Sequence, residues 1–412
     1  MLHSPLGFKL FLTTIHTLFV VKQEAQSQIG SIKEGVVPSS AADSVADART
    51  ILPQVPPCMG SYQEVLIESS VKLVEFLSGI SPLLEVALDT EADSLHCYFE
   101  KLCLIQVSTD SATVLIDPLS GVELQLLFKG LLDKRVVFHG ADYDLRLLAR
   151  YGEFRPHEIF DTMVAARLLG YNQLGLAALV ERFFGVKLSK ASQKANWALR
   201  PLPRQMVEYA ANDTKFLLPL AGILEAEIVR LGRQEWLRQS LERLFRSTKT
   251  HKEKDLSRAW RIAGSATLQP YAQAVLRELW NWREAEAREW NRPPFYVMSN
   301  EDMLKAAEAA TRGVLSSPRF SPSRRKRFRQ TLARALQIPE DCWPLQDKPA
   351  RYFPSKQAVE EFGRLKRLRD EVAREEKLDP AIIAPRNILE SIAFQKNLSG
   401  LMDWQKCLLQ LG

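Results

Sequence analysis

Apolar residues recur along residues 61–231 in two different rhythms. Short apolar runs bounded by polar turns are typical of buried strands; they occur at Glu64–Glu68, Leu84–Leu88, Leu102–Ser108, Thr113–Ile116 and Arg135–Phe138. Apolar residues at helical spacing occupy Val71–Ile80, Leu124–Leu132, Tyr143–Tyr151, Thr162–Leu169, Leu174–Phe184 and Gln205–Leu231. Because the strands between residues 84 and 116 follow one another without a helix, we expect them to be antiparallel neighbours. This order predicts an α/β domain: a mixed sheet with helices on both faces.

The second half of the chain has a helical pattern. A polar, proline-containing stretch near Gln346–Pro354 divides this half into two parts. At 412 residues the chain is too long for a single core, because domains usually hold about 50 to 200 residues. We therefore expect the α/β domain to be followed by one or two all-α domains.

Residues 1–58 precede this pattern. Leu10–Val21 is mostly apolar and follows Lys9, an outline that resembles a short secretory signal, yet the run is too short to span a bilayer. Residues 23–58 are polar and rich in Ser, Ala and Pro, a composition typical of disorder. Met59 stands before the first periodic segment and is an alternative translation start. We predict that residues 1–58 are a disordered or mis-assigned extension.

Charge is distributed unevenly between the two halves. The chain has a formal net charge of +6. Residues 241–412 hold 32 Lys and Arg and 22 Asp and Glu, a net charge of +10, so residues 1–240 have a net charge of −4. An acidic half beside a basic half suggests a cation site joined to a module that binds a polyanion. The five cysteines are scattered and show no zinc-ligand spacing, which favours a reducing compartment. We predict a cytoplasmic protein.

Asp89 and Glu91 end the apolar strand that begins at Leu84. Residues two apart on a strand point to the same face, so both carboxylates would lie side by side. Carboxylates this close repel one another unless a cation lies between them, and hard cations such as Mg²⁺ or Mn²⁺ prefer oxygen ligands. Taken alone, Asp-x-Glu fits a strand end with two solvated acids better than a metal site, but the acids downstream change that balance.

Two further positions bring acids into the same region. Where Phe-His-Gly-Ala-Asp-Tyr-Asp joins a strand to a helix, at the strand end where open α/β sheets place ligands, Asp142 suits a helix cap. Asp144, one turn into the helix, would face the site. Tyr209 and Asp213 lie four residues apart on one helical face. Asp161 also precedes an apolar helix, and we assign it to capping.

The order and spacing of these residues resemble a known family. Asp89-Thr90-Glu91, the run from His139 to Asp144, and Tyr-x3-Asp at 209–213 resemble the three exonuclease motifs of the DEDDy class, and the flanking residues are most similar to bacterial ribonuclease D. A further stretch typical of that family is matched by Lys187, Gln193, Trp197 and Arg200-Pro201-Leu202. The resemblance covers roughly residues 61–235. It implies an RNase H-like fold and a two-metal 3′→5′ exonuclease that acts on RNA.

The residues suit the chemistry that this resemblance implies. Two divalent cations, Mg²⁺ or Mn²⁺, about 4 Å apart can hold the attacking and leaving oxygens of a phosphoryl displacement. Four acids supply the ligands: Asp89, Glu91, Asp144 and Asp213. Tyr209, with an ordinary pKa of about 10, is a poor general base near neutral pH. We interpret it as orienting a metal-activated water; a plain core aromatic is the alternative.

Contacts with nucleic acid are predicted at two places. In the first, Lys187 and Arg200 would hold phosphates, Trp197 would stack on a base near the 3′ end, and Gln193 would also contact the nucleic acid; a loop buttressed by the tryptophan and solvated by the basic residues explains this stretch equally well. The second is the basic cluster Arg324, Arg325, Lys326 and Arg327. Phosphate contact and a solvated helix face are its two interpretations, and the charge of this half favours contact.

The helical half resembles a second known module. The run from Leu276 to Arg288, with the Asn-Arg-Pro-Pro-Phe that follows, is similar to the HRDC domain of ribonuclease D and RecQ-type helicases, which implies a small helical bundle that assists nucleic-acid binding. We expect Pro293-Pro294 to break one helix and Asn300 to cap the next. Residues 365–409 resemble the later part of the same domain. The predicted divisions are an extension at 1–58, a DEDDy exonuclease domain at 59–240, an HRDC domain at 250–340 and a second, degenerate HRDC-like domain at 350–412.

The leading hypothesis is a metal-dependent 3′→5′ exoribonuclease that trims the 3′ ends of tRNA or other structured RNA precursors and releases 5′-nucleoside monophosphates. A 3′→5′ DNA exonuclease of the proofreading or Werner type has related motifs but fits the C-terminal modules less well. A catalytically dead nucleic-acid-binding protein is disfavoured because all five chemical positions are present. The expected partner is RNA, with no membrane and no obligate protein partner.

Overall fold

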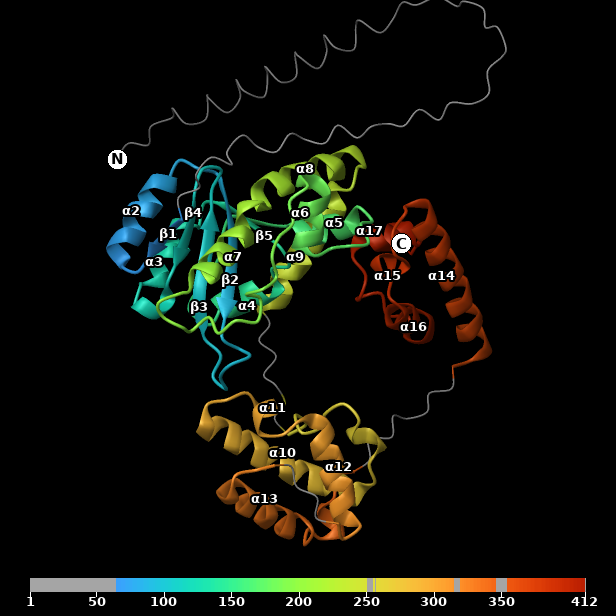
Figure 1. The fold of residues 1–412 in the computed structure, drawn as a ribbon. Helices are drawn as coiled ribbons and strands as arrows, with labels where there is room; N and C mark the ends of the chain where they lie inside the picture. Colours follow the sequence, from blue (N-terminus) through green and yellow to red (C-terminus); the bar gives the residue numbers. More distant parts are fainter. Residues whose placement is uncertain (1–63, 250–254, 256, 315–318, 346–353, 412) are drawn as a thin grey trace, which may run out of the picture. The chain divides into compact units, whose positions relative to one another are not determined.

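The structure, a computed structural model, describes residues 64–249, 255, 257–314, 319–345 and 354–411 (Figure 1). The predicted extension at residues 1–58 and the alternative start at Met59 lie outside these residues. Within the described part of the chain, every helix is too short or too polar to cross a membrane.

Six strands form one mixed sheet in the order β1-β4-β3-β2-β5-β6. The strands are β1 (Glu64–Ile67), β2 (Glu85–Ala92), β3 (Leu102–Ser108), β4 (Thr113–Ile116), β5 (Arg135–Phe138) and β6 (Glu158–Asp161). β3 pairs antiparallel with β2 and β4, as the uninterrupted run of strands predicts, and the other pairs are parallel. All residues of β3 are buried, because it lies inside the sheet with helices on both faces. The predicted mixed α/β fold is confirmed.

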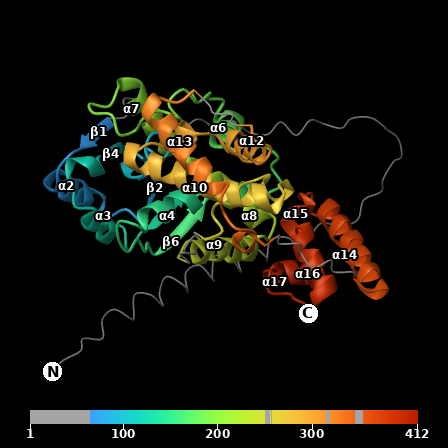
Figure 2. The same ribbon diagram turned by 90° about the horizontal axis from the view of Figure 1, so that it is seen from below.

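Helices pack on both faces of this sheet. They are α2 (Ser70–Ile80), α3 (Leu124–Gly130), α4 (Asp142–Leu148), α5 (Thr162–Leu168), α6 (Leu176–Phe184), α7 (Arg204–Lys215), α8 (Leu217–Arg230) and α9 (Gln234–Lys249). Figure 2 shows α2, α3 and α4 along one side of the strands and α7 along the other. Under α7, Met206 and Ala210 pack on Leu104 of β3. The larger core includes Leu88 and Val107, which point to the opposite face.

The predicted helical stretch from Gln205 to Leu231 is two helices, α7 and α8, which meet at Phe216. Pro219 explains the break. Proline has no backbone N–H, and its ring clashes with the carbonyl four residues earlier in a continuous helix. That residue is Lys215, the last of α7. In the observed arrangement Pro219 falls in the first turn of α8, where its missing N–H costs nothing.

Residues 257–314 and 319–345 form a helical unit with its own core. Its α-helices are α10 (Pro270–Trp290), α11 (Pro294–Val297), α12 (Asn300–Thr311) and α13 (Pro322–Ala335). Trp282 of α10 packs edge-on against Phe328 of α13, with 5.2 Å between ring centroids. The break before Pro294 occurs as predicted. The expected cap does not: Ser299 accepts the Asp302 N–H (3.0 Å), and Asn300 is already helical.

The C-terminal helices share a core with the nuclease domain. They are α14 (Lys356–Glu375), α15 (Pro380–Ile383), α16 (Arg386–Gln395) and α17 (Asp403–Leu408). Trp404 stacks on Trp236 of α9 with ring centroids 4.7 Å apart, and the buried Arg233 donates to Glu376 (2.7 Å). A long helix, a one-turn helix that begins at proline, and a medium helix follow one another here as in α10–α12. The second HRDC-like copy remains a prediction that this order supports.

Candidate active site

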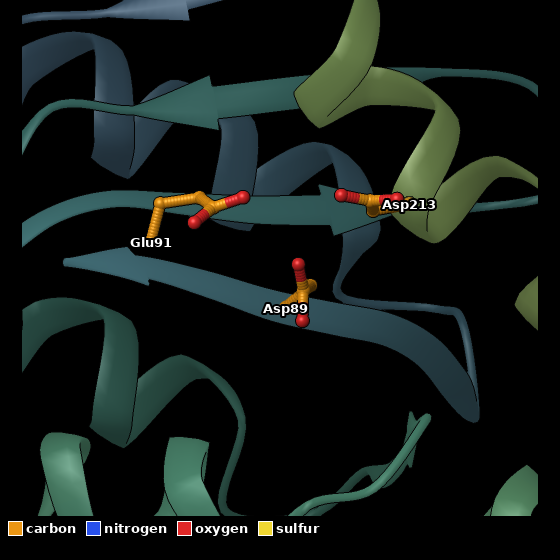
Figure 3. Close-up of side chains that lie close together, drawn as sticks. All are labelled: Asp89, Glu91 and Asp213. Carbon is orange, nitrogen blue, oxygen red and sulfur yellow. The ribbon is translucent and has the colours of Figure 1, made fainter. Parts of the chain in front are cut away.

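Three carboxylates converge at the carboxyl-terminal part of β2 (Figure 3). Asp89 and Glu91 project from one face of that strand, and Asp213 reaches them from α7. One carboxylate oxygen of each residue lies within 4.8 Å of the others. Two segments more than 120 residues apart in the chain therefore contribute to one acidic cluster.

The contacts between α7 and the sheet fix the position of Asp213. One side of the helix is buried against β3 and β4 through Met206, Ala210 and Thr214. The Thr214 hydroxyl forms a 2.7 Å hydrogen bond with Ser108 at the end of β3. Because Asp213 precedes Thr214, it points toward β2 from the border of this buried side.

Asp144 approaches β2 along an edge that no strand occupies. The pairing of β2 with β5 ends at Ala87, opposite Val137. The later part of β2, which carries Asp89 and Glu91, therefore has no described strand beside it on this edge. α4 begins in this place, and its buried Asp144 accepts a hydrogen bond of 2.5 Å from the Thr90 hydroxyl. Thr90 therefore links Asp144 to β2, the strand that carries Asp89 and Glu91.

Asp161 holds the turn that precedes α4. Its carboxylate caps α5, as predicted, by accepting the Met163 and Val164 N–H groups. It also accepts the N–H groups of Gly140 (3.0 Å) and Ala141 (2.8 Å). Gly140 has a φ of 80°, a conformation that favours glycine. A single buried carboxylate thus fixes both the start of α5 and the turn that orients Asp144.

The capping role predicted for Asp142 is wrong. α4 begins at Asp142 itself, after Ala141, and lacks a side-chain cap. The exposed Asp142 carboxylate instead accepts two hydrogen bonds from Arg146, one turn later. Asp161, on a different element, accepts the N–H groups of Gly140 and Ala141 just before the helix, so it holds the turn without capping α4.

Burial and mutual repulsion raise the pKa values of the acidic cluster. For Asp89 the pKa is raised by burial first and then by the charges of Asp144, Asp213 and Glu91. Burial, followed by Asp213 and Asp144, raises the pKa of Glu91 to about 9. Burial also raises the pKa of Asp213 to about 7 and that of Asp144 to about 6. Without a cation, these four groups cannot all ionise readily at neutral pH.

This donor set fits a hard divalent cation. The ligand atoms are all carboxylate oxygens, the type that Mg²⁺ and Mn²⁺ prefer. A bound cation would lower the pKa values of all four acids and remove the repulsion between them. The candidate ligands are Asp89, Glu91 and Asp213, with Asp144 beside them.

Tyr209 lies one turn before Asp213 on α7 and hydrogen-bonds to it, which lowers the pKa of the aspartate. Its own pKa is raised above 10 by burial and then by the charges of Asp213 and Glu91. The phenol therefore stays protonated and donates. Its ring packs against Trp197, with 5.9 Å between ring centroids.

The acidic cluster opens into a cleft of about 700 Å³. The cleft is lined by all five predicted catalytic positions and also by His139, Tyr143, Gln193 and Lys190. Among these, Lys190 was not singled out from the sequence, although it lies within the stretch from Lys187 to Arg200. Thr90 was also missed as a functional residue, because its bond to Asp144 depends on a contact 54 residues along the chain.

Comparison with known proteins gives the chain a family. Residues 65–229 match the family model described as 3′-5′ exonuclease, and residues 272–336 match that of the HRDC domain. Ribonuclease D of Desulfotalea psychrophila is 30% identical over 343 residues, which cover 80% of this chain and 90% of that protein. The chain belongs to the ribonuclease D family. Ribonuclease D of Sphingobium indicum is 32% identical over 247 residues, 59% of this chain and 63% of that protein, so that match spans less than two thirds of the relative.

Solved structures agree with this membership. RNase D of Escherichia coli superposes with a TM-score of 0.63 at 26% identity, covering 85% of this chain and 98% of that one. The catalytic core of RRP6 from Trypanosoma brucei gives a TM-score of 0.59 at 27% identity, over 70% of this chain and 83% of that core. The predicted ribonuclease D resemblance, with its exonuclease fold and HRDC domain, is confirmed.

Two of the predicted RNA contacts in this ribonuclease D family member are committed to the protein itself. Trp197 is buried at 1% exposure, so its ring is not available to stack on a base. Arg200 donates two hydrogen bonds, of 2.5 and 2.6 Å, to the buried Asp117 carboxylate and a third to the Cys103 carbonyl. Both residues buttress the loop, which is the alternative that the sequence left open.

The other two residues of that stretch differ in position. Gln193 is exposed and lines the cleft. Lys187 is 85% exposed, lies 3.7 Å from Glu181 and is not among the lining residues. Contact with RNA therefore remains a prediction for both, with the stronger support for Gln193.

The basic cluster on α13 is partly used within its own unit. Arg324 and Arg327 both pair with Glu286, which is buried in α10. Arg325 donates to the Phe320 carbonyl (3.1 Å). Lys326 is exposed. The guanidinium groups of Arg324 and Arg327 thus hold α13 against α10, and phosphate contact by this cluster remains a prediction.

Proposed function

We propose that this chain is a metal-dependent 3′→5′ exoribonuclease that trims the 3′ ends of tRNA or other structured RNA precursors. The observation that carries the proposal is the convergence of Asp89, Glu91 and Asp213 within 4.8 Å, in a cleft that Asp144 and Tyr209 also line. Membership in the ribonuclease D family supports the activity. The Escherichia coli relative is described as an exoribonuclease involved in structured RNA processing, which supports the class of substrate.

Two divalent cations, Mg²⁺ or Mn²⁺, are the proposed cofactors, with Asp89, Glu91, Asp144 and Asp213 as their ligands. Such ions supply a nucleophilic water near neutral pH and stabilise charge on the attacking and leaving oxygens. The chain contributes a fixed set of carboxylates, held from β2, α4 and α7. Tyr209 keeps its proton, so in this proposal it donates a hydrogen bond near the reacting water rather than accepting a proton. Each cycle would release one 5′-nucleoside monophosphate.

We further propose RNA as the partner, without an obligate protein partner, and the cytoplasm as the compartment. The exposed Lys190 and Gln193 beside the acidic cluster support contact with a phosphate backbone. Cys97, Cys103, Cys342 and Cys407 are free thiols in the described residues, which supports a reducing compartment.

The experiment uses the full chain and matched RNA and DNA oligomers with a 3′-hydroxyl. We expect stepwise shortening of RNA from the 3′ end with Mg²⁺ or Mn²⁺, with mononucleotide products, and no shortening in excess EDTA. Asp144→Asn should nearly abolish turnover while leaving RNA affinity much less affected. Asp142→Asn is the matched control, because that exposed carboxylate pairs with Arg146 outside the acidic cluster.

Three results would contradict the proposal. They are full activity in EDTA, cleavage of a circular RNA, and loss of activity in Asp142→Asn with an active Asp144→Asn. Faster degradation of DNA than of RNA would instead favour the DNA exonuclease alternative.

A further inference from the structure

Gln106 is a fully buried amide without a hydrogen-bond partner. Its exposure is 0%, and neither the side-chain nitrogen nor the side-chain oxygen bonds to any described residue. Leaving a buried donor or acceptor unpaired lowers the free energy of unfolding, and an apolar residue of the same shape would avoid that cost. The protein therefore keeps glutamine here at the expense of stability.

The register of the sheet places Gln106 directly beside Asp89. β2 and β3 are antiparallel, and Asp89 is the cross-strand partner of Gln106. Residues paired in this way point to the same face, with Cβ atoms about 4.5–5.5 Å apart. On the other side, Gln106 is paired with Leu115 of β4. The amide thus lies between a candidate metal ligand and an apolar residue.

The neutral groups on this face offer the amide no comparable partner, and the other carboxylate of β2, Glu91, is paired with Leu104 rather than with Gln106. Leu104, two residues before Gln106, is apolar. Ser108, two residues after it, is already bonded to Thr113 (2.6 Å) and to Thr214 of α7 (2.7 Å). Above it, α7 presents the buried Ala210. The Asp89 carboxylate is the acceptor that the register places beside it.

We propose that Gln106 is a positioning residue for Asp89: when the site holds a metal, its amide N–H would donate to the Asp89 carboxylate and fix the orientation of that ligand. A carboxylate that ligates a metal must hold one orientation, and such ligands are commonly oriented by a hydrogen bond from a neighbouring residue. An amide can donate this bond without adding charge to a cluster that already holds four acids. The inference rests on the proposed metal-dependent function.

The test compares Mn²⁺ binding by the full-length wild type, Gln106→Met and Leu115→Met, measured by titration calorimetry on metal-free protein. Methionine is unbranched and close to glutamine in volume, so it removes the amide with little change in packing. Leu115→Met is the matched control, since it places methionine in the same layer on the next strand. We expect Gln106→Met to bind Mn²⁺ about 10–100-fold more weakly and to have a lower kcat with an unchanged KM. Its thermal midpoint in EDTA should be equal to or above that of the wild type, while the control should match the wild type in metal binding.

The outcomes separate this inference from the function beneath it. Absence of Mn²⁺ binding by the wild type would overturn the proposed function. Wild-type binding with equal affinity in Gln106→Met would overturn the positioning role alone. A Gln106→Met protein that unfolds, or melts well below Leu115→Met in EDTA, would also overturn it, because the amide would then be serving the fold.

Discussion

The Thr90 hydroxyl donates a 2.5 Å hydrogen bond to Asp144 Oδ1, which joins β2 to the first turn of α4. Thr90 stands between Asp89 and Glu91 in the chain, so one strand positions three of the four candidate ligands. The same bond lowers the pKa of Asp144 against the effect of burial. Both consequences, the orientation and the ionisation of Asp144, can be tested by substitution.

Replacing Thr90 with valine keeps the shape and removes the hydroxyl. We expect Thr90→Val to raise the pKa of Asp144 further above about 6 and to lower turnover about 10-fold or more near neutral pH. The acid limb of the pH–rate profile should move to higher pH, because protonated Asp144 cannot serve as a ligand. Thr90→Ser restores the hydroxyl and should restore both properties. An unshifted profile in Thr90→Val would show that the bond does not control Asp144.

The acidic cluster should make the metal-free protein less stable as pH rises. The pKa values of Asp144, Asp213 and Glu91 are raised to about 6, 7 and 9, above those of the unfolded chain near 4. Between these values the folded state binds more protons than the unfolded state, so this contribution to stability is present at low pH and lost as the pH rises through the folded pKa values. We expect these groups to lower the thermal midpoint in EDTA progressively between about pH 4 and pH 9 and Mg²⁺ to reverse the fall.

Asp213→Asn provides the control for this pH dependence. It removes one charge from the cluster, so the metal-free variant should lose less stability with rising pH and gain less from Mg²⁺. A wild type whose midpoint in EDTA stays level across the same range, with no response to Mg²⁺, would contradict the predicted repulsion.

Arg200 and Lys190 are basic residues of one loop, but we expect Arg200 to matter for folding stability and Lys190 for RNA binding. Arg200→Ala leaves the buried Asp117 unpaired and should cost about 3 kcal/mol or more of folding free energy. Lys190→Ala removes an exposed charge at the cleft and should leave stability unchanged. It should reduce the slope of log K against log salt for single-stranded RNA by about 0.7. Thermal melts and RNA titrations at several salt concentrations measure both quantities. Unchanged stability with weaker RNA binding in Arg200→Ala would restore the phosphate role predicted from the sequence.

The C-terminal helices should be required for the stability of the nuclease domain. Trp404→Ala removes a buried ring that stacks on Trp236 and should cost about 3–5 kcal/mol. Trp290→Ala is the comparison, since that ring is 47% exposed and its removal should cost much less. Truncation after residue 345 exposes the same shared core and should lower the thermal midpoint of the nuclease domain as well. A truncated chain that melts like the full-length protein would show that the two parts are stable independently.

The sequence alone determined the features that depend on local repetition. Asp89 and Glu91 share a face because strand side chains alternate, and Tyr209 and Asp213 share one because helical positions recur every 3.6 residues. The order of strands and helices likewise predicts the mixed sheet. The break between α7 and α8 was missed, because Gln205–Leu231 was interpreted as one helical stretch, although the effect of Pro219 acts over only four residues.

Only the tertiary structure decided which side chains meet across elements. Asp161 rather than Asp142 serves the turn before α4, Arg200 and Trp197 are committed to the fold, and Gln106 lies beside Asp89. Each of these facts depends on the register between strands or on packing between distant segments. A periodic pattern shows which face a residue occupies, but it does not show what lies opposite that face. The residues opposite that face decide whether a polar side chain binds substrate or its own protein, because a buried polar group needs a hydrogen-bond partner within the fold.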